Sequence, residues 1–456
     1  MICANIAAKN AEELPVKRMT DLFAVVGKPV LHSKSPEMHN AAFNACGINA
    51  KYIRLASDSA EEALETAKEL GINGFNVTSP FKEQMFKLVD ESDVFARKTG
   101  AVNTVVINNG RIFGYNTDVA GVSRAFTANG INLINKKTLV VGAGGAARAA
   151  VVALLNESAK VTIANRTVEN ARNIANEFGS EYSSLEESEL GSAMKECTVI
   201  IGCTSTKGQI IPKRYLKSGM VVLDANYSSE TALVCDARTA GCLVLDAREW
   251  LLHQGVLAFE LFTNRQAPFE LMRKAVYETK SKDVRKTNVA LIGFMGSGKT
   301  TVAKRISEKT SMTLFSIDGE IEHETGKRIQ EIFVNDGETE FRNMERKQLL
   351  KLKNMQNQVI DCGGGAVLNE DNRKQLTKNA TVIWLLAKPE TVLERIKSDK
   401  SRPLLNIADK EERKAVAERL IKSRLGLYAE TAHILINTEG KNPDKVAERI
   451  IYETGV

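Results

Sequence analysis

Two glycine-rich loops of different design lie in this chain of 456 residues, and each directly follows a short apolar run. The second loop reads GFMGSGKT, from Gly293 to Thr300. The first reads GAGGAA and begins with Gly142, Ala143, Gly144, Gly145 and Ala146. Backbone N–H groups in such loops, placed at the start of a helix, bind phosphate. The chain is therefore expected to contain two phosphate sites on two α/β units.

A chain of this length is too long for one ordinary hydrophobic core, which predicts two or three domains. Its hydrophobic content of 43% and charged content of 26% are typical of a water-soluble globular protein. The net charge of +6 is modest and does not indicate nucleic-acid binding. The seven cysteines show no regular spacing, which favours reduced thiols, and no apolar run approaches the length of a membrane span. We therefore expect a cytoplasmic protein with small-molecule partners and without membrane or nucleic-acid partners; a monomer and a homodimer both remain open.

Helical and strand-like patterns alternate along the chain, which predicts α/β layers with mostly parallel sheets. The charged, aperiodic stretch near residue 285 marks the clearest domain border. The expected division is a leader of unknown role (1–20), a first lobe (21–125), a second lobe (126–253), a helix of about 254–280 that returns to the first lobe, a linker (281–286) and a separate α/β unit (287–456).

The first loop follows the strand-like run 137–141 and precedes a helix-forming stretch, the order in which a dinucleotide-binding unit is built. The next strand ends at Asn165, Arg166 and Thr167 instead of the acidic residue that typically holds the ribose of NAD. A guanidinium beside small polar groups suits a 2′-phosphate, so NADP(H) is preferred. The alternative is a helix cap with an exposed arginine.

Polar strings before this unit predict a pocket for a small hydroxylated acid, because amides and hydroxyls hydrogen-bond such a ligand while Lys and Asp can move a proton. Turn chemistry alone explains any one of them but not all four together. The strings contain Ser33 and Ser35 in HSKSPEMHN, Thr78 and Lys82 in NVTSPFK, Asn103 in GAVNT, and Asp118 in NTD.

Together these strings resemble shikimate dehydrogenase over residues 21–280. The resemblance implies NADPH-dependent reduction of 3-dehydroshikimate to shikimate, with Lys82 as proton donor and acceptor and Asp118 beside it. It also implies that the substrate contacts are Ser33, Ser35, Thr78, Asn103, Asp118, Tyr227 and Gln254. Asn170 stands where the family pattern has a second arginine, which leaves Arg166 as the main phosphate ligand, assisted by Arg172.

The second loop matches GxxxxGK[ST], the pattern of nucleoside-triphosphate sites. In such loops the lysine, here Lys299, reaches the outer phosphates, and the hydroxyl of Thr300 is a magnesium ligand. The expected nucleotide contacts are Gly296, Ser297, Gly298, Lys299, Thr300 and Thr301.

The strings DGEIE, GETEFRNME, GGG, RPLL and RLGLY follow this loop, and the set resembles shikimate kinase over residues 287–456. By that resemblance shikimate binds Asp318, Arg342, Gly364 and Arg424, and Asp318 also accepts or orients the proton of the 3-hydroxyl. Arg402 would close over the phosphates from a lid, Arg395 would lie near adenine, and Glu345 would steady Arg342. The alternative is that these arginines are ordinary solvated charges on the protein surface.

One departure concerns magnesium, because Ser316 replaces the first carboxylate of the family's Asp-x-Asp. Either Asp361 substitutes for it, or magnesium rests mainly on Thr300 and ATP. The sequence thus predicts a two-lobed dehydrogenase, with a substrate lobe and a Rossmann NADP lobe, followed by a P-loop kinase domain. The two reactions would be consecutive steps of the shikimate pathway, toward chorismate and the aromatic amino acids, and would use NADP(H), ATP and Mg²⁺.

Two alternatives remain open. One is a quinate/shikimate dehydrogenase fused to a kinase for another small alcohol, such as gluconate. The other is that one half only senses a ligand.

Overall fold

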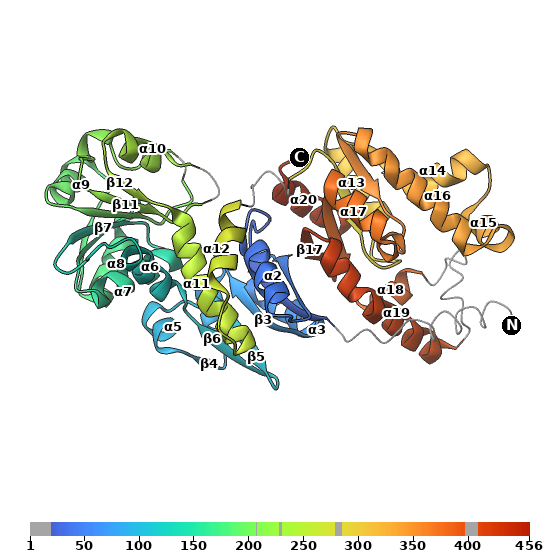
Figure 1. Ribbon diagram of the computed structural model, residues 1–456, viewed down its shortest axis with the longest axis horizontal. Helices are drawn as coiled ribbons and strands as arrows, with labels where there is room; N and C mark the ends of the chain where they lie inside the picture. The colour runs from blue at the N-terminus through green and yellow to red at the C-terminus, as the bar shows by residue number, and fades with distance from the viewer. Residues whose placement is uncertain (1–19, 207, 228–229, 279–284, 397–408) are drawn as a thin grey trace.

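The computed structural model describes residues 20–206, 208–227, 230–278, 285–396 and 409–456. Three bodies lie in a row, and the first lobe occupies the middle between the second lobe and the C-terminal unit (Figure 1). All but the last residue of the predicted leader, and residues 281–284 of the predicted linker, lie outside the described residues.

The first lobe is a twisted sheet with the strand order β2-β1-β3-β5-β6-β4. Strands β1 and β2 are almost wholly buried because helices cover both of their faces. Its elements are β1 (Asp21–Gly27), α2 (Ser35–Ala45), β2 (Ala50–Ala56), α3 (Ala60–Glu69), β3 (Ile72–Val77), α4 (Lys82–Phe86), β4 (Glu91–Ser92), α5 (Val94–Thr99), β5 (Thr104–Asn108), β6 (Arg111–Tyr115) and α6 (Asp118–Thr127).

The second lobe contains six parallel strands in the order β12-β11-β10-β7-β8-β9. The chain order reverses between β7 and β10, and ligands bind at such a switch point in open α/β sheets. Its elements are β7 (Lys137–Val141), α7 (Gly145–Asn156), β8 (Lys160–Ala164), α8 (Val168–Phe178), β9 (Glu181–Ser183), α9 (Glu187–Met194), β10 (Val199–Gly202), β11 (Val221–Asp224), α10 (Ala232–Thr239) and β12 (Leu243–Leu245), with a short 3₁₀ turn at Lys213–Tyr215.

The chain then returns to the first lobe, but through two helices instead of the single helix expected over 254–280. These are α11 (Ala247–Thr263) and α12 (Phe269–Glu278). Asn264 ends α11 in the left-handed conformation with φ of 51°, and Pro268 follows. The predicted start was late because Asp246 caps α11 by accepting a hydrogen bond from the Arg248 amide at 2.9 Å.

The C-terminal unit has a parallel sheet in the order β14-β15-β13-β16-β17, with the glycine loop after its central strand β13. No helix among the described residues combines the length and apolar character needed to cross a membrane. The elements of this unit are β13 (Val289–Ile292), α13 (Lys299–Lys309), β14 (Thr313–Ser316), α14 (Ile317–Thr325), α15 (Ile329–Asn335), α16 (Gly337–Lys351), β15 (Gln358–Asp361), α17 (Glu370–Asn379), β16 (Thr381–Leu386), α18 (Pro389–Arg395), α19 (Lys410–Thr431), β17 (Ile434–Asn437) and α20 (Pro443–Thr454), with 3₁₀ turns at Leu352–Asn354 and Ala366–Leu368.

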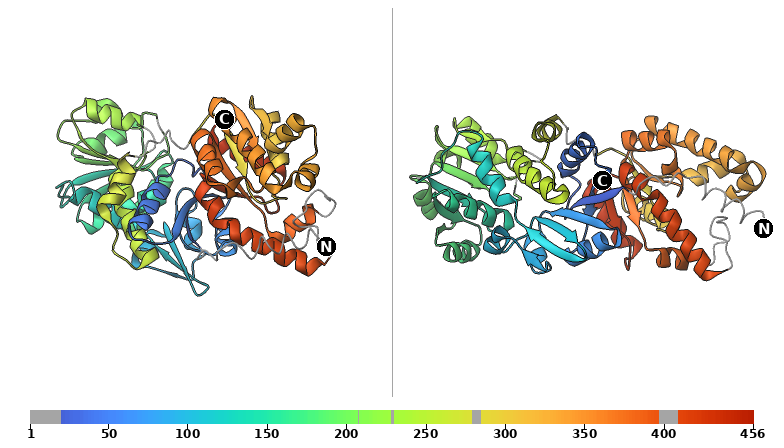
Figure 2. Two further views of the ribbon diagram at one scale, coloured as in Figure 1. Left: turned by 45° about the vertical axis from the view of Figure 1, so that its right-hand side comes forward. Right: turned by 60° about the horizontal axis from the view of Figure 1, so that its bottom comes forward.

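The C-terminal unit is not separate from the first lobe, contrary to expectation. Strand β17 pairs in parallel with β2, Leu435 beside Leu55 and Ile436 beside Ala56, so the two sheets form one sheet of eleven strands. The junction is visible in both views of Figure 2, where the red C-terminal strand and helix lie against the blue first lobe. The Asn437 amide donates to the Thr66 hydroxyl across this junction at 2.8 Å. Pairing with β17 also covers an edge of the first-lobe sheet that would otherwise expose unpaired N–H and C=O groups.

Candidate active sites

The lysine and aspartate predicted for proton transfer form a close ion pair. Lys82 begins α4 and Asp118 begins α6, and Nζ of Lys82 lies 2.6 Å from Oδ2 of Asp118. Both side chains are mostly buried, at 15% and 7% exposure. The indole N–H of Trp250 on α11 donates to the other carboxylate oxygen at 3.0 Å. Each oxygen of Asp118 thus has a partner, and the carboxylate holds the ammonium of Lys82 in place.

A network of buried amides and hydroxyls lies on the elements next to this pair. Asn103 donates to the Thr117 hydroxyl at 2.9 Å and to Oε1 of Gln254 at 3.4 Å, and its own oxygen accepts the Thr117 amide at 2.8 Å. The Gln254 amide donates to the Leu251 carbonyl at 2.8 Å. The structure therefore brings together Asn103 and Gln254, which are 151 residues apart in the chain.

The serines predicted to bind a carboxylate lie together where the chain enters α2. The Ser33 and Ser35 hydroxyls are buried and 3.3 Å apart. Tyr227 from the second lobe hydrogen-bonds Ser33, and burial raises the pKa of its phenol, which therefore stays a neutral donor. Thr78 is half-buried at the carboxyl end of β3, where its amide donates to the Val26 carbonyl at 2.8 Å.

The first glycine loop has the backbone geometry that only glycine fits easily. Gly142 has φ of 127°, and a Cβ there would lie 2.6 Å from the Cys203 carbonyl oxygen. Gly144 caps α7, so Gly145 and Ala146 begin that helix with free N–H groups, and Ala143 precedes the cap. A Cβ on Gly145 would lie 3.2 Å from Cβ of Lys82. The loop therefore packs directly against Lys82, the lysine of the ion pair with Asp118.

Arg166 follows β8, is exposed, and forms no ion pair with any residue that the structure describes. Beside it, Asn165 donates to the Thr167 carbonyl at 3.0 Å and so shapes the turn. Arg172, which was expected to assist Arg166 in binding the phosphate, already contacts two neighbouring side chains. It pairs with Glu169 at 2.9 Å and lies over the Tyr182 ring.

The second glycine loop forms a compact cradle before α13. Lys299 is buried and donates to the carbonyls of Gly293 and Phe294 at 3.0 Å each. Gly296 and Gly298 have φ of 76° and 94°. Ser297 is buried within the loop, while Thr300 and Thr301 are exposed on the first turn of α13, beside the N–H groups at its start. Arg395 on α18 reaches the loop and donates to the Gly296 carbonyl at 3.2 Å.

The residues predicted to bind the phosphoryl acceptor lie around the glycine triplet that follows β15. Arg424 donates to the Gly364 carbonyl at 3.2 Å, and a Cβ on Gly364 would lie 3.3 Å from the amide of Met295 in the phosphate loop. Arg342 contacts the buried carboxylate of Glu345 at 3.1 Å, as expected. A Cβ on Gly363 would lie 3.3 Å from Oδ1 of Asp318 and 2.8 Å from Oε1 of Glu345. Two guanidinium groups and two carboxylates therefore gather around a glycine triplet whose Gly364 lies against the phosphate loop.

Ser316, which stands at the family's carboxylate position, has a structural use. Its hydroxyl caps α14 by accepting from the Gly319 amide at 3.3 Å. Asp361 lies beside Ser316 in the register of β14 and β15, and beside Leu291 of β13 on its other side. The carboxylate of Asp361 is thus at the carboxyl edge of the sheet, next to the strand that leads into the phosphate loop.

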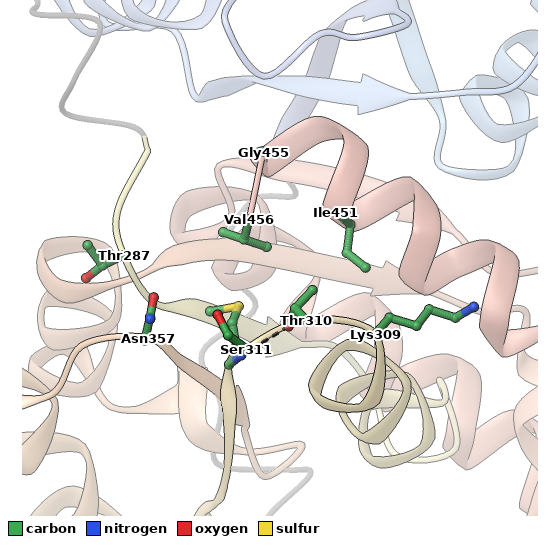
Figure 3. Close-up of a pocket in the computed structure, with 9 residues that line it drawn as sticks. Thr287, Lys309, Thr310, Ser311, Asn357, Ile451, Gly455 and Val456 are labelled. Carbon is green, nitrogen blue, oxygen red and sulfur yellow. Dashed lines mark hydrogen bonds between the residues drawn. The ribbon is translucent and has the colours of Figure 1, made fainter.

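Arg402, predicted to lie on a lid, is outside the described residues. A pocket shown in Figure 3 is lined by Thr287, Met312 and Asn357, which precede β13, β14 and β15, together with Val456. It therefore lies at the amino edge of the sheet, opposite the phosphate loop, and belongs to neither site.

Two side chains of the sites were missed as site residues. Trp250 holds Asp118, and the Tyr428 hydroxyl donates to the Gly364 carbonyl at 2.9 Å. Both lie four residues from a predicted site residue on the same helix, Trp250 before Gln254 and Tyr428 after Arg424. That spacing places side chains on one helix face and is the signal that could have found them.

The fold and the two sites define a two-lobed, dinucleotide-dependent dehydrogenase joined to a P-loop kinase. Four family models match the chain, and each agrees with one part of this architecture. They are the shikimate dehydrogenase substrate binding domain (25–105), shikimate / quinate 5-dehydrogenase (124–228), the shikimate 5′-dehydrogenase C-terminal domain (251–277) and shikimate kinase (295–454).

Known proteins similar to the chain agree with these matches. The shikimate dehydrogenase (NADP(+)) of Natronomonas pharaonis is 42% identical over 263 residues, which are 56% of this chain and 98% of that protein. The solved shikimate dehydrogenase from Aquifex aeolicus has a TM-score of 0.55 at 35% identity and covers 58% of this chain and 100% of its own. The solved shikimate 5-dehydrogenase from Thermus thermophilus, in complex with NADP(H) and shikimate, has a TM-score of 0.52 at 32% identity. It covers 56% of this chain and 98% of its own. The chain belongs to the shikimate dehydrogenase family and carries a C-terminal shikimate kinase domain.

Proposed function

We propose that this chain catalyses two consecutive reactions of aromatic amino-acid biosynthesis: reduction of 3-dehydroshikimate to shikimate, and phosphorylation of shikimate to shikimate 3-phosphate. The observation that carries the proposal is a similar arrangement at the two glycine loops. One glycine loop lies against Lys82, which pairs with Asp118, and the other lies against the glycine triplet that Arg342 and Arg424 contact. Both sets of side chains suit a small hydroxylated acid.

In the first reaction Lys82 donates a proton to the carbonyl oxygen of the substrate as negative charge develops there. Bound NADPH supplies the hydride for this reduction. The ammonium both stabilises the developing charge and neutralises it, which is the role of a general acid. Asp118 holds the ammonium at 2.6 Å and keeps it aimed, and Trp250 keeps Asp118 from turning away.

Substrate binding in this site is assigned to two groups of side chains. Ser33, Ser35 and Tyr227 present hydroxyls that donate to the carboxylate of the substrate. The ring hydroxyls are assigned to other polar side chains of the pocket, namely Thr78, Asn103, Asp118 and Gln254. The hydrogen bonds of Asn103 with Gln254 and Thr117 preorganise this part of the pocket before substrate arrives, which limits the entropy lost on binding.

The residues present fit NADP(H). The left-handed Gly142 and the free N–H groups at the start of α7 form a cradle for a pyrophosphate. Arg166 is exposed and pairs with no carboxylate in the described part of the chain, while Asn165 and Thr167 shape the turn around it. These features suit the 2′-phosphate that distinguishes NADP from NAD.

In the second reaction Asp318 accepts or orients the proton of the shikimate 3-hydroxyl. ATP with magnesium supplies the phosphoryl group. Arg342 and Arg424 bind the shikimate carboxylate, because guanidinium groups match its planar geometry. Gly364 gives the ring close access to the backbone. The nucleotide is assigned to Gly296, Ser297, Gly298, Lys299, Thr300, Thr301, Arg395 and Arg402.

Magnesium is assigned to the hydroxyl of Thr300, which is exposed at the start of α13. The carboxylate lost at Ser316 is supplied from the neighbouring strand by Asp361, which shares its position in the sheet register. Hydroxyl and carboxylate oxygens are the ligands that magnesium prefers. The alternative, in which ATP and Thr300 hold the ion alone, does not use the buried carboxylate beside the loop.

We assign a substrate lobe (21–125), an NADP lobe (126–246), a returning segment that begins at Ala247, and a kinase unit (287–456) whose sheet joins that of the substrate lobe. The small-molecule substrates are the partners we assign, without nucleic acid or membrane. The six cysteines that the structure describes are all unpaired, which supports a reducing compartment and hence the cytoplasm.

Separate assays of the two halves test the proposal on the intact protein. NADPH oxidation should require 3-dehydroshikimate, and ADP formation should require shikimate. Quinate as a better dehydrogenase substrate, or gluconate as a better kinase substrate, would favour the corresponding alternative fusion. Binding of shikimate without any turnover in one half would favour a sensor.

A further inference from the structure

The last helix of the kinase domain reaches into the substrate lobe of the dehydrogenase. Glu453 on α20 is fully buried, and its Oε2 accepts hydrogen bonds from the backbone N–H groups of Val30 and Leu31 at 2.9 and 3.0 Å. Its Oε1 lies 2.9 Å from Nη2 of Arg449, one turn earlier on the same helix. Arg449 donates in turn to the carbonyls of Gly27 and Ser57 at 3.2 and 3.0 Å.

The backbone that Glu453 holds leads directly into the serines assigned to the substrate carboxylate. The Ser33 amide donates to the Val30 carbonyl at 3.0 Å, so the turn and the first serine form one hydrogen-bonded unit. Arg54 on β2 holds the other side of this unit, donating to the Ser33 carbonyl at 3.0 and 2.6 Å. The same guanidinium donates to the carbonyl of His433 in the kinase domain at 3.3 Å.

We propose that Glu453 of the kinase domain is a positioning residue for the dehydrogenase: it orients the turn that presents Ser33 and Ser35 to the substrate. The inference rests on the proposed function, because it takes these serines as the carboxylate site. A carboxylate is the strongest acceptor available for two adjacent backbone N–H groups. Without it, two buried donors lack partners, and the turn shifts until they find water or another acceptor.

The test compares full-length variants by the kinetics of shikimate oxidation and by kinase activity. Glu453→Ala is expected to raise KM for shikimate about tenfold, the loss that corresponds to one or two hydrogen bonds, with KM for NADP⁺ and kinase activity near wild type. Glu453→Gln keeps one oxygen acceptor and is expected to give a KM for shikimate between those of the wild type and Glu453→Ala. Glu448→Ala is the matched control, since Glu448 lies on the same helix, is exposed, and pairs with Lys309 inside the kinase domain.

A shikimate KM for Glu453→Ala within about twofold of wild type overturns the proposal, because that is smaller than the loss of one such hydrogen bond. An equal loss of dehydrogenase and kinase activity in Glu453→Gln also overturns the proposal, because a purely structural contact would lower both activities. Should Glu453→Ala not fold, Glu453→Gln decides alone, by whether its shikimate KM rises while its NADP⁺ KM does not. Failure of the proposed function is distinguishable, since the wild-type protein would then not oxidise shikimate at all.

Discussion

Removing the amine of Lys82 should disable the dehydrogenase and leave the kinase working. Lys82→Met is a better variant than Lys82→Ala, because its unbranched side chain keeps the packing of the lysine stem. That stem lies against Gly145, where an added Cβ would be 3.2 Å from Cβ of Lys82. The amine contributes proton transfer, typically worth about 10²–10⁴ in rate, or roughly 3–5 kcal/mol of transition-state stabilisation. Because this contribution arises in the transition state, kcat should fall by that factor while KM for shikimate changes much less.

The assay is steady-state shikimate oxidation, with kinase activity of the same sample as the internal measure of folding. The variant also leaves Asp118 buried without its cation, although the Trp250 N–H still donates to it at 3.0 Å. Breaking a buried ion pair costs about 3–5 kcal/mol of stability, so some lowering of the melting temperature is expected as well. A fall in kcat of less than about tenfold, with the kinase intact, would refute the assignment of Lys82 as the proton donor.

Three further predictions use other parts of the molecule. Lys299→Ala should abolish ATP turnover and spare shikimate oxidation, and retained turnover would contradict the assignment of the phosphate loop. Arg166→Gln should raise KM for NADP⁺ about tenfold with little change in KM for NAD⁺, as measured in parallel titrations; equal changes would remove Arg166 from the 2′-phosphate site. Burial lowers the pKa of His39 from 6.5 to about 3. Below pH 6.5 the unfolded chain therefore binds a proton at His39, whereas the folded protein does not. The free energy of unfolding should consequently fall by about 2 kcal/mol between pH 7 and pH 5. In urea denaturation, His39→Phe should keep the stacking on Tyr52 and lose that part of the pH dependence, and an unchanged slope would exclude His39 as its source.

The parts of the fold that could be predicted from the sequence are those that depend on local residue patterns. Short apolar runs that end in a glycine loop predicted β7 and β13, since a strand, a tight turn and a helix start must occur in that order to bind phosphate. The break between α11 and α12 was missed because the apolar pattern continues on both sides of Asn264. The first helix ends at Asn264, which adopts the left-handed conformation, and Pro268 follows before the second helix.

The joined sheet could not be predicted, because strand pairing between distant segments leaves no local pattern. Strand β17 (ILIN) and strand β2 (AKYIRLA) are both short, and nothing in either sequence specifies the other as its neighbour. The role of the buried Glu453 likewise leaves no local pattern in the sequence. Its two backbone partners are more than four hundred residues away.

Within the sites, residue identity was predictable where it carries chemistry and less so where it supports that chemistry. Lys82, Asp118 and Arg342 stand in strings whose residue types already suggest proton transfer or carboxylate binding. Trp250 and Tyr428 act only by holding a neighbour, and aromatic residues on a helix usually indicate core packing. Ser316 shows the converse, because its replacement of a carboxylate could be seen in the sequence, whereas its use as a helix cap needed the structure.

The central claim is that two sites in one chain act on the same ring acid in succession. Its most direct test is to incubate the intact protein with 3-dehydroshikimate, NADPH, ATP and magnesium, and to identify the products by mass spectrometry. We predict that shikimate 3-phosphate forms from the wild-type protein and that Lys299→Ala stops at shikimate. Consumption of NADPH with no phosphorylated product, even when shikimate is supplied in excess, would contradict the claim.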